Sequence, residues 1–447
     1  MRILVVGGNA AGLSAASKAR RTAADVEILV LERGRDISYA QCGLPYLLSG
    51  MVADEAALVH FTPAGIMRER GIEVRTGHHV TALRLSEHQV LGERTDGTPF
   101  AEPYDRLILA TGARPRVPPA LSPPASNVFT LHTYQDLRRL RVFLAAQKPP
   151  RVTIVGASYL GLEMAEAFRT LGLAVTVLEA APQPLPGFDS PLASLAADEL
   201  ARNNVHLMLE RPASALDIDG GGICRAVVGD WGSQHCDAVL LALGVRPNVE
   251  LAEQAHLRLG PTGAIPTDRR LATERPGVFA CGDCAETVHL VTGKPTWVPL
   301  GSTANKQGRV AGANAVGGDE SFSGVVGTAG LRLFNLEMAR TGLSLREAQA
   351  SGFEAAVVTI TAPSRAAYMR GASEITISLV VESATRRILG AHAAGKEGVA
   401  KRVDLFAVAA AQGLTADDVA GWDLSYAPPF APVWDPVLVA ANVARRR

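Results

Sequence analysis

The residue best suited to chemistry in this sequence is Cys42, within the segment Ser38–Tyr46. Gly43 and Pro45 bend the backbone just after it, and a predicted strand ending at Glu32 precedes the segment. A thiolate is a nucleophile and a redox group, and the reactivity of a cysteine depends on its pKa. We therefore predict that Cys42 is a redox-active thiol.

The composition limits the functions in which such a thiol could take part. A chain of 447 residues exceeds what one hydrophobic core usually covers, so we expect two or three domains. Basic and acidic residues balance at 44 each, which gives no net field to attract nucleic acid or an anionic membrane. No apolar run approaches the roughly 20 residues of a membrane-spanning helix, and no export signal is recognised. We expect a cytoplasmic protein whose five irregularly spaced cysteines form no disulfide framework.

The N-terminal residues have the pattern of a dinucleotide-binding unit. An apolar strand is followed by a glycine turn from Gly7 to Gly12, a predicted helix, and a second strand that ends at Glu32. Backbone N–H groups at such a turn can approach a pyrophosphate, and an acid 25 positions after Gly7 can accept hydrogen bonds from a ribose. Asn9 stands in the middle glycine position, so this turn alone is weak evidence.

The same pattern occurs a second time. The turn Gly156–Gly161, with Ser158 in the middle position, follows an apolar strand, and a later strand ends at Glu179, 23 positions after Gly156. Two such units imply two dinucleotides, or a flavin and a nicotinamide nucleotide. A carboxylate at position 179 favours NADH over NADPH, because a 2′-phosphate would face a negative charge.

Three further segments complete the pattern. An apolar strand stops at Thr111-Gly112, a counterpart stops at Leu243-Gly244, and a third strand runs into Gly282-Asp283. The residues from about 326 onward carry no glycine turn and alternate strand-like and helical segments.

With these motifs in this order, the chain resembles the pyridine nucleotide-disulfide oxidoreductases over essentially its whole length. It is most similar to their single-cysteine branch, which contains coenzyme A-disulfide reductases, NADH oxidases, NADH peroxidases and persulfide or polysulfide reductases. The resemblance implies an α/β fold with two Rossmann-like dinucleotide-binding domains and a C-terminal α+β dimerisation domain, in a homodimer. We expect an FAD-binding domain at 1–112 and 246–325, an NAD-binding domain at 113–245 and a dimerisation domain at 326–447.

The resemblance also assigns the cofactors FAD and NADH and the residues that bind them. Tyr159 is expected to gate the nicotinamide site. Since Asp283 is assigned to the ribityl-phosphate region of FAD, the Cys281-x-x-Cys284 spacing is not interpreted as a redox pair, and no metal site is expected. The expected cofactor-binding residues are Gly7, Gly12, Glu32, Arg33, Thr111, Gly112, Asp283, Gly156, Ser158, Tyr159, Gly161, Glu163, Glu179 and Gly244.

A lone cysteine restricts the chemistry. Two-cysteine members of the superfamily carry a second cysteine five residues after the first, and Leu47 occupies that position here. A single thiol can form a mixed disulfide with a small thiol or a sulfenic acid. Oxidases and peroxidases of the branch carry a histidine in the first glycine turn, where this chain has Ala10. That difference disfavours peroxide chemistry.

The resemblance to coenzyme A-disulfide reductases supplies the remaining expected site residues. Tyr426 and Tyr368 match two tyrosines that the partner subunit brings to the cysteine, and coenzyme A is a further candidate ligand. Lys18 and Arg21 lie three positions apart on one predicted helix, so they share a face that could meet a phosphate. The positions that match coenzyme A contacts are Ser14, Lys18, Arg21, Ser38, Gln41, Arg70, Asn305 and Trp434.

These observations predict an FAD-dependent NADH:disulfide oxidoreductase that reduces coenzyme A disulfide or persulfide through Cys42. We expect the flavin and neighbouring donors to lower the pKa of this thiol. The alternatives are a polysulfide or sulfur reductase, and a peroxide-forming NADH oxidase.

Overall fold

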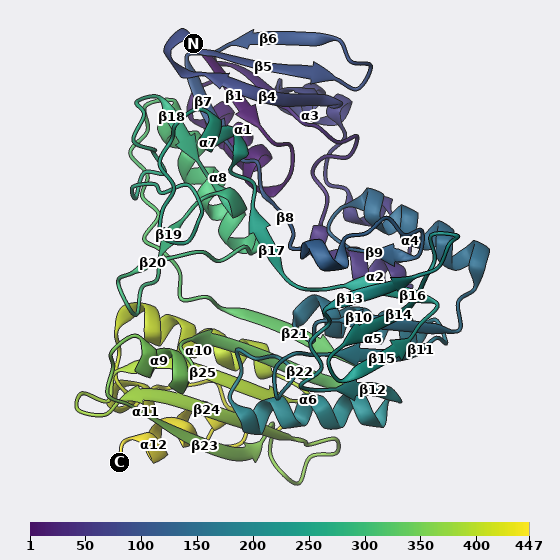
Figure 1. The fold of residues 1–447 in the computed structure, drawn as a ribbon. Coiled ribbons are helices and arrows are strands. Elements are labelled where there is room, and N and C mark those ends of the chain that lie inside the picture. Colours follow the sequence, from purple (N-terminus) through teal and green to yellow (C-terminus); the bar gives the residue numbers. More distant parts are fainter. Residues whose placement is uncertain (447) are drawn as a thin grey trace.

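The computed structural model of the protein describes residues 1–446. It contains three five-stranded sheets, each packed against helices (Figure 1). Each sheet with its surrounding helices and short strands is called a part of the molecule: the first part, the second part and the C-terminal part. In Figure 1 the first sheet lies at the top, the second at the right and the C-terminal sheet at the bottom. No helix within residues 1–446 is long and apolar enough to span a membrane. The two parallel sheets and the separate antiparallel one confirm the predicted fold class.

The first sheet joins strands from two distant parts of the chain. Its order is β18-β7-β1-β2-β3, with all neighbours parallel. Ile3 to Val6 of β1 are all buried, as expected for a parallel strand covered on both faces. The strand bounds are β1 (Arg2–Val6), β2 (Glu27–Leu31), β3 (Glu73–Arg75), β7 (Arg106–Leu109) and β18 (Val278–Ala280).

Helices and short strands surround this sheet. Helices α1 (Ala10–Thr22) and α8 (Gly301–Ala315) cross closely, because a Cβ on Gly308 or Gly312 would overlap carbonyl oxygens of α1. The other elements of this part are α2 (Leu44–Leu48), α3 (Pro63–Arg70), α7 (Glu250–Gln254), the antiparallel strands β4 (His78–Arg84), β5 (Gln89–Arg94) and β6 (Pro99–Pro103), and the pair β19 (Thr287–Val288) and β20 (Pro295–Thr296).

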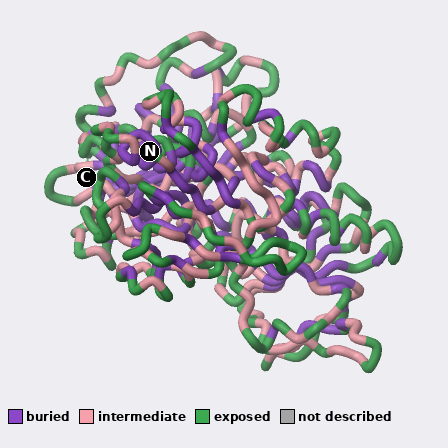
Figure 2. The backbone as a smooth tube through the Cα atoms, turned by 90° about the horizontal axis from the view of Figure 1, so that it is seen from above, coloured by how far each residue is buried: buried purple, intermediate pink, exposed green. Residues whose placement is uncertain are grey.

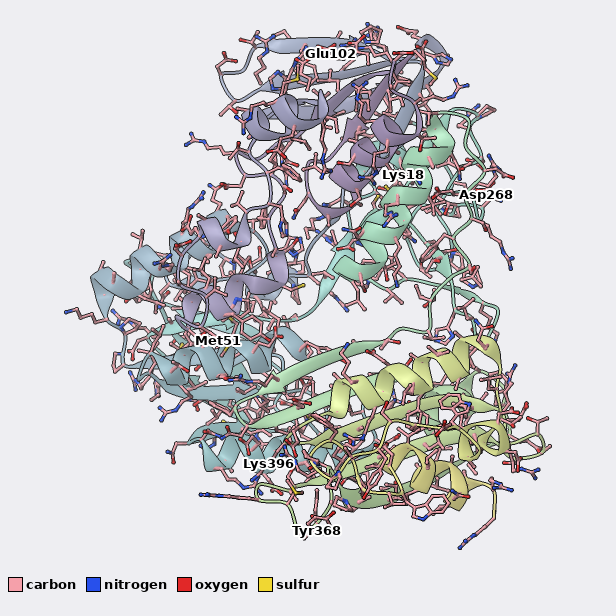
Figure 3. The ribbon with its side chains drawn as sticks, turned by 180° about the vertical axis from the view of Figure 1, so that it is seen from behind. Lys18, Met51, Glu102, Asp268, Tyr368 and Lys396 are labelled. Carbon is pink, nitrogen blue, oxygen red and sulfur yellow. The ribbon has the colours of Figure 1, made fainter. Side chains whose placement is uncertain are left out.

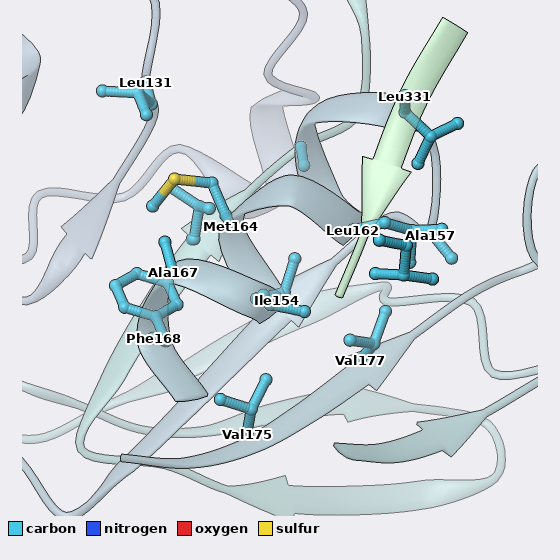
Figure 4. Packing of buried hydrophobic residues seen from close by; sticks show 14 of the residues in the cluster. Leu131, Ile154, Ala157, Leu162, Met164, Ala167, Phe168, Val175, Val177 and Leu331 are labelled. Carbon is cyan, nitrogen blue, oxygen red and sulfur yellow. The ribbon is translucent and has the colours of Figure 1, made fainter. Parts of the chain in front are cut away.

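The second sheet is also parallel, in the order β12-β11-β10-β16-β9. Figure 4 shows its core, where Ile154, Val175 and Val177 of the strands pack beneath Phe168 and Met164 of α5. The elements are β9 (Val128–Phe129), β10 (Arg151–Val155), β11 (Ala174–Leu178), β12 (Val205–Met208), β16 (Ala238–Leu241), α4 (Tyr134–Gln147), α5 (Tyr159–Thr170) and α6 (Ser190–Arg202), with a small antiparallel sheet of β13 (Ala215–Ile218), β14 (Cys224–Gly229) and β15 (Gly232–His235).

The C-terminal sheet is antiparallel, in the order β21-β22-β25-β24-β23. Helix α10 packs against β22 and β25, and α12 packs against β23 and β24. The bounds are β21 (Ala329–Leu333), β22 (Leu336–Gly342), β23 (Ala355–Pro363), β24 (Glu374–Glu382), β25 (Ile388–Gly395), α9 (Leu345–Ala350), α10 (Val399–Gln412), α11 (Ala416–Ala420) and α12 (Pro436–Ala444).

Two short antiparallel strands link the first two parts. They are β8 (Ala113–Pro115) and β17 (Val245–Pro247), which begin just after Gly112 and Gly244, both at positive φ. In Figure 2 the buried residues lie mostly in the interior and the outer loops are mostly exposed. Along the chain, strands of the first sheet lie both before and after the strands of the second sheet. The exact domain boundaries stay a prediction.

Candidate active site

A cavity of about 1810 Å³ lies where the three parts of the molecule meet. The first part contributes its glycine turn and the Cys42 segment to the lining. The second part contributes Tyr159 and Glu163, and the C-terminal sheet contributes Arg340. All three parts therefore present side chains to one shared space.

The first glycine turn packs tightly against the strand end at Ala110 and requires glycine at position 7. Gly7 has φ of +113°, and a Cβ there would overlap the carbonyl oxygen of Ala110. Glu32 lies at the end of β2, where its Oε2 accepts a hydrogen bond from the Gly8 N–H at 2.7 Å and its Oε1 accepts one from the Gly34 N–H at 2.6 Å. The acid thereby fixes the turn at the edge of the cavity.

The second glycine turn repeats this construction. Gly156 has φ of +108°, and a Cβ there would overlap the carbonyl oxygen of Ala242. Glu179 accepts hydrogen bonds from the Ala157 N–H at 2.7 Å and from the Ala181 N–H at 2.9 Å. Two turns of the same design, each with a carboxylate at its strand end, fit two dinucleotides.

Cys42 lies in a single helical turn, Gln41–Gly43, that leads into α2. Its side chain is open to solvent on the cavity side. Partial burial by the cavity walls, followed by the charges of Glu163 and Asp283, raises the pKa of this thiol. The expectation that neighbouring donors lower the pKa is therefore wrong for the protein's own groups, because a backbone hydrogen bond is outweighed by burial and by two carboxylates.

Glu163 is one of two carboxyl groups of the cavity whose pKa is strongly raised. The Tyr46 hydroxyl donates a hydrogen bond to its Oε1 at 3.1 Å, which joins α2 to α5. Burial is the main cause that raises the pKa of Glu163 to about 7, and the charge of Glu166 adds to it. A carboxyl group with this pKa can hold or release a proton near neutral pH.

Asp283 follows β18 in the short helical turn Gly282–Cys284. Burial raises the pKa of Asp283 to about 6, and its backbone carbonyl accepts a hydrogen bond from Trp297 Nε1 at 2.8 Å. Cys281 and Cys284 are fully buried, and the Cys284 thiol donates to the carbonyl oxygen of Leu109 at 3.4 Å. The two cysteines are packed as small core residues beneath the carboxyl group.

The segments that cross between the first two parts are locked together at the cavity rim. Thr111 Oγ1 donates to the carbonyl oxygen of Asn248 at 2.7 Å, and Asn248 Nδ2 donates to that of Thr111 at 2.8 Å. Arg114 pairs with Glu250 beside them. This reciprocal contact fixes the angle at which β8 and β17 leave the first part.

Most of the predicted site residues share this cavity. Asn9 Oδ1, in the middle position of the first turn, accepts from the Tyr39 N–H at 3.2 Å and so holds the Cys42 segment against the turn. The predicted residues that line the cavity are Cys42, Gly7, Glu32, Arg33, Thr111, Gly112, Asp283, Ser158, Tyr159, Glu163, Ser14, Arg21, Ser38, Gln41, Arg70 and Asn305.

Other predicted residues lie outside the lining. Gly12, Gly156, Gly161, Glu179 and Gly244 shape the backbone behind it or next to it. Lys18 forms an ion pair with Glu320 instead of facing the cavity.

Tyr368 and Tyr426, which are predicted to act from the partner subunit, do not line the cavity of their own chain. Trp434, predicted as a coenzyme A contact, does not line it either, and all three are exposed on the C-terminal part. In Figure 3, Tyr368 lies at the bottom of the molecule and Lys18 in its upper half. Within one chain the structure does not bring these residues to the thiol.

Three residues at or next to the cavity were not singled out by the sequence analysis. His132 and Arg340 line it, and Tyr46 contacts it through its hydrogen bond to Glu163. His132 Nδ1 lies 3.0 Å from Gln41 Nε2, so it supports the residue next to Cys42. No local motif marks them, because each reaches the site through a contact between segments about 90 or more positions apart in the chain.

Comparison with known families supports this geometry. Residues 1–308 match the family model described as pyridine nucleotide-disulphide oxidoreductase. Residues 328–436 match the dimerisation domain of the same family.

Individual relatives extend over the whole chain. A Pyrococcus furiosus protein named NAD(P)H sulfur oxidoreductase (CoA-dependent) is 36% identical over 445 residues, 99% of each chain. A coenzyme A disulfide reductase of Staphylococcus aureus is 30% identical over 433 residues, 96% of each chain. The solved structure of an NAD-dependent persulfide reductase from A. fulgidus matches with a TM-score of 0.97 at 36% identity, covering 100% of this chain and 83% of that one.

Proposed function

The chain belongs to the pyridine nucleotide-disulphide oxidoreductase family, and from this we propose that it reduces coenzyme A disulfide or persulfide with NADH. The observation that carries the proposal is a lone thiol, Cys42, in a cavity that also reaches both dinucleotide turns. Leu47 occupies the position of a second cysteine, and the other four cysteines are buried. The second half of the reacting disulfide must therefore come from the substrate.

The residues present fit FAD at the first turn and a nicotinamide nucleotide at the second. Gly7 and Gly156 hold the two turns in a backbone conformation that a Cβ would prevent, and the cavity of about 1810 Å³ can hold large ligands. Glu32 and Asp283 would hold FAD, and Glu179 would hold the second ribose. The chemistry that FAD supplies when bound is two-electron exchange between a hydride donor and a disulfide. A carboxylate at Glu179 supports NADH as the donor.

Cys42 performs the exchange with the substrate. Its thiolate attacks one sulfur of the substrate disulfide, so that a Cys42–S bond forms, the original S–S bond breaks and one thiolate leaves. Two electrons that originate from NADH, with one proton, then return the mixed disulfide to the Cys42 thiolate and a second free thiol. Because partial burial and two carboxylates raise the pKa of Cys42, we expect turnover to rise with pH in the alkaline range.

Basic residues at one end of the cavity support a phosphorylated thiol such as coenzyme A. Arg21 and Arg70 line it, and Arg70 is held by a hydrogen bond to Ser17 Oγ at 2.5 Å and by the Phe61 ring, 4.4 Å below its guanidinium carbon. Lys18 is neutralised by Glu320, so the two arginines carry more of the proposed phosphate recognition.

A homodimer would complete the site. Tyr368, Tyr426, Phe430 and Trp434 are exposed on the C-terminal part, which matches the dimerisation domain. Large exposed aromatic side chains of this kind are typical of an interface. We propose that Tyr426 and Tyr368 of the partner subunit reach the Cys42 thiol, where a phenol can protonate the leaving thiolate.

The first prediction tests the thiol. We expect Cys42→Ser to keep its bound FAD and to lose reduction of coenzyme A disulfide, because a serine hydroxyl cannot form the mixed disulfide. The measurement is NADH consumption with coenzyme A disulfide, alongside the flavin absorbance. The control is Cys236→Ala, a buried cysteine of the second part, which should keep its turnover. Turnover of Cys42→Ser at the wild-type rate would overturn the proposal.

The same assay separates the alternatives. NADH consumption with a polysulfide in place of coenzyme A disulfide measures the sulfur reductase activity. Peroxide formation without any disulfide measures the oxidase activity. Ala10 lines the cavity where oxidases and peroxidases of the branch carry a histidine. We therefore expect slow peroxide release and fast disulfide reduction.

A further inference from the structure

The loop between β11 and α6 connects the second glycine turn to the C-terminal sheet. It begins at Glu179, and the Leu185 N–H donates to the carbonyl oxygen of Ala157, in the turn itself, at 2.8 Å. Gln183 Nε2 donates to the carbonyl oxygen of Phe188 at 2.8 Å, which closes the loop on itself. Leu185 has φ of +49°, an uncommon value for leucine that needs support from its surroundings.

The C-terminal sheet holds the next residues of this loop. Arg340 of β22 and His392 of β25 are direct cross-strand partners and so lie on the same face of the sheet. Arg340 donates to the carbonyl oxygen of Gly187 in the loop, to that of Gly342 at 3.2 Å, and to Glu347 Oε2 at 2.5 Å. A planar guanidinium with five donors suits three acceptors at once, which an ammonium group with its different geometry matches less well.

His392 holds the next two residues of the loop. Its ring is completely buried, 5.4 Å from the ring of Phe188, and its Nδ1 accepts a hydrogen bond from the Asp189 N–H at 3.3 Å. The pair of side chains from the C-terminal sheet therefore contacts three consecutive residues of the loop.

Phe188 connects the loop to Tyr159, the residue expected to gate the nicotinamide site. The Tyr159 ring lies 6.3 Å from the Phe188 ring, centroid to centroid. The Tyr159 hydroxyl is buried and makes no hydrogen bond within residues 1–446. Packing rather than a hydrogen bond therefore sets the position of Tyr159, and Phe188 is one wall of that packing.

We propose that Arg340 is a positioning residue for the NADH site, which holds the Glu179–Asp189 loop and, through Phe188, the Tyr159 gate. The inference rests on the proposed use of NADH by this chain. Arg340 lines the cavity beside Tyr159, but its donors are engaged with Gly187, Gly342 and Glu347. It acts on the nucleotide through the loop rather than by touching the reacting atoms.

The physical reason is preorganisation. Without Arg340 the Gly187 carbonyl loses a charge-assisted hydrogen bond, and the loop must be ordered when the nucleotide binds. The entropy lost when the loop becomes ordered then offsets part of the binding free energy of the nucleotide. The disulfide half of the reaction uses Cys42 and the cavity end near Arg70, so it does not depend on this loop.

The experiment compares Arg340→Met with the wild type as FAD-loaded holoenzymes. We expect the Kd for NAD⁺ and the KM for NADH to rise by about tenfold, with an unchanged KM for coenzyme A disulfide. Hydrogen exchange at the Leu185 and Phe188 amides should become faster. Arg340→Lys, which keeps the charge without the fork, should show a smaller increase in Kd and covers the case in which Arg340→Met fails to fold.

The matched control is Arg386→Met. It also removes an arginine–carboxylate ion pair of the C-terminal part, between Arg386 and Asp417, but lies away from the loop. The proposal is overturned if Arg340→Met and Arg340→Lys bind NAD⁺ within about twofold of the wild type, or if Arg386→Met weakens binding as much. Binding of NAD⁺ is measured without any disulfide, so this result stands apart from the outcome for the disulfide substrate.

Discussion

At the scale of single residues, Cys42 and Glu163 share one electrostatic environment. Glu163 has a pKa of about 7 and is therefore ionised at the higher pH at which a thiol with a raised pKa titrates. Its negative charge then disfavours the Cys42 thiolate. As the pH rises, the Glu163 carboxyl group therefore ionises before the Cys42 thiol, and its charge raises the pKa of the thiol.

The second prediction follows from this coupling. Glu163→Gln removes the charge, so the pKa of Cys42 should fall. We expect the pH midpoint of Cys42 alkylation by iodoacetamide to move to lower pH. The holoenzyme is first reduced with a small thiol, so that the result does not depend on NADH. Glu55→Gln, at a surface carboxylate outside the cavity lining, is the control and should leave the midpoint in place. An unchanged or higher midpoint in Glu163→Gln would contradict the coupling.

Residue roles were predictable where they depend on neighbours in sequence. The turn at Gly7 and the acid at Glu32 form one short unit, and the structure places them together. The hydrogen bond from Tyr46 to Glu163 joins residues 117 positions apart, and no pattern in the sequence indicates it. The direction of the Cys42 pKa shift was missed for the same reason, since it depends on burial and on distant carboxylates.

At the scale of elements, the β21–β22 hairpin is anchored by the second part of the molecule. Glu166 Oε2 of α5 accepts from the Phe334 N–H at 2.7 Å, and Glu199 Oε1 of α6 accepts from the Asn335 N–H at 3.1 Å. Both glutamates are buried, and Phe334 has φ of +52°. Leu331, Leu333, Leu336 and Met338 of the hairpin belong to the core of the second sheet. Figure 4 shows Leu331 next to Leu162 and Ala157.

The third prediction concerns these two carboxylates. We expect Glu166→Ala and Glu199→Ala each to lower the free energy of unfolding by about 1–3 kcal/mol, because each leaves a backbone N–H of the turn without its acceptor. Urea denaturation of the holoenzyme measures the change. Asp198→Ala, at the exposed neighbour of Glu199 on the same helix, should change stability by less than about 0.5 kcal/mol. Equal losses of stability in Glu199→Ala and Asp198→Ala would contradict the hairpin contact as the cause.

Elements were predictable from sequence where a strand meets a glycine turn and an acid. The hairpin contact was not, because Glu166 and Glu199 look like ordinary helix residues. Their burial results from packing between segments more than 130 positions apart.

At the scale of the whole molecule, each site is proposed to need two chains. Cys42 lines the cavity of its own chain, whereas Tyr426 is exposed on the far part. In a dimer with twofold symmetry each residue would complete the site of the other chain.

The fourth prediction uses this arrangement. Cys42→Ser and Tyr426→Phe should each be impaired as pure dimers, while subunits mixed by unfolding and refolding should recover about a quarter of the wild-type activity, because half of the dimers are mixed and each then holds one intact site. Turnover of coenzyme A disulfide measures the recovery. Mixing Cys42→Ser with Cys42→Ala controls for refolding and should give none. No recovery in the first mixture would place both residues in the same site of one chain, or Tyr426 outside the site.

The first sheet has a consequence for how the protein is made. Strand β18 pairs with β7, yet 168 residues lie between Leu109 and Val278 in the chain, and the whole second sheet is synthesised between them. During translation the second part can fold as soon as β16 emerges, since all of its strands lie between Val128 and Leu241. The first part must wait with an open edge at β7 until β18 arrives. The unit that begins the chain is therefore among the later ones to close, and flavin capture is expected to follow, rather than precede, formation of the nucleotide domain.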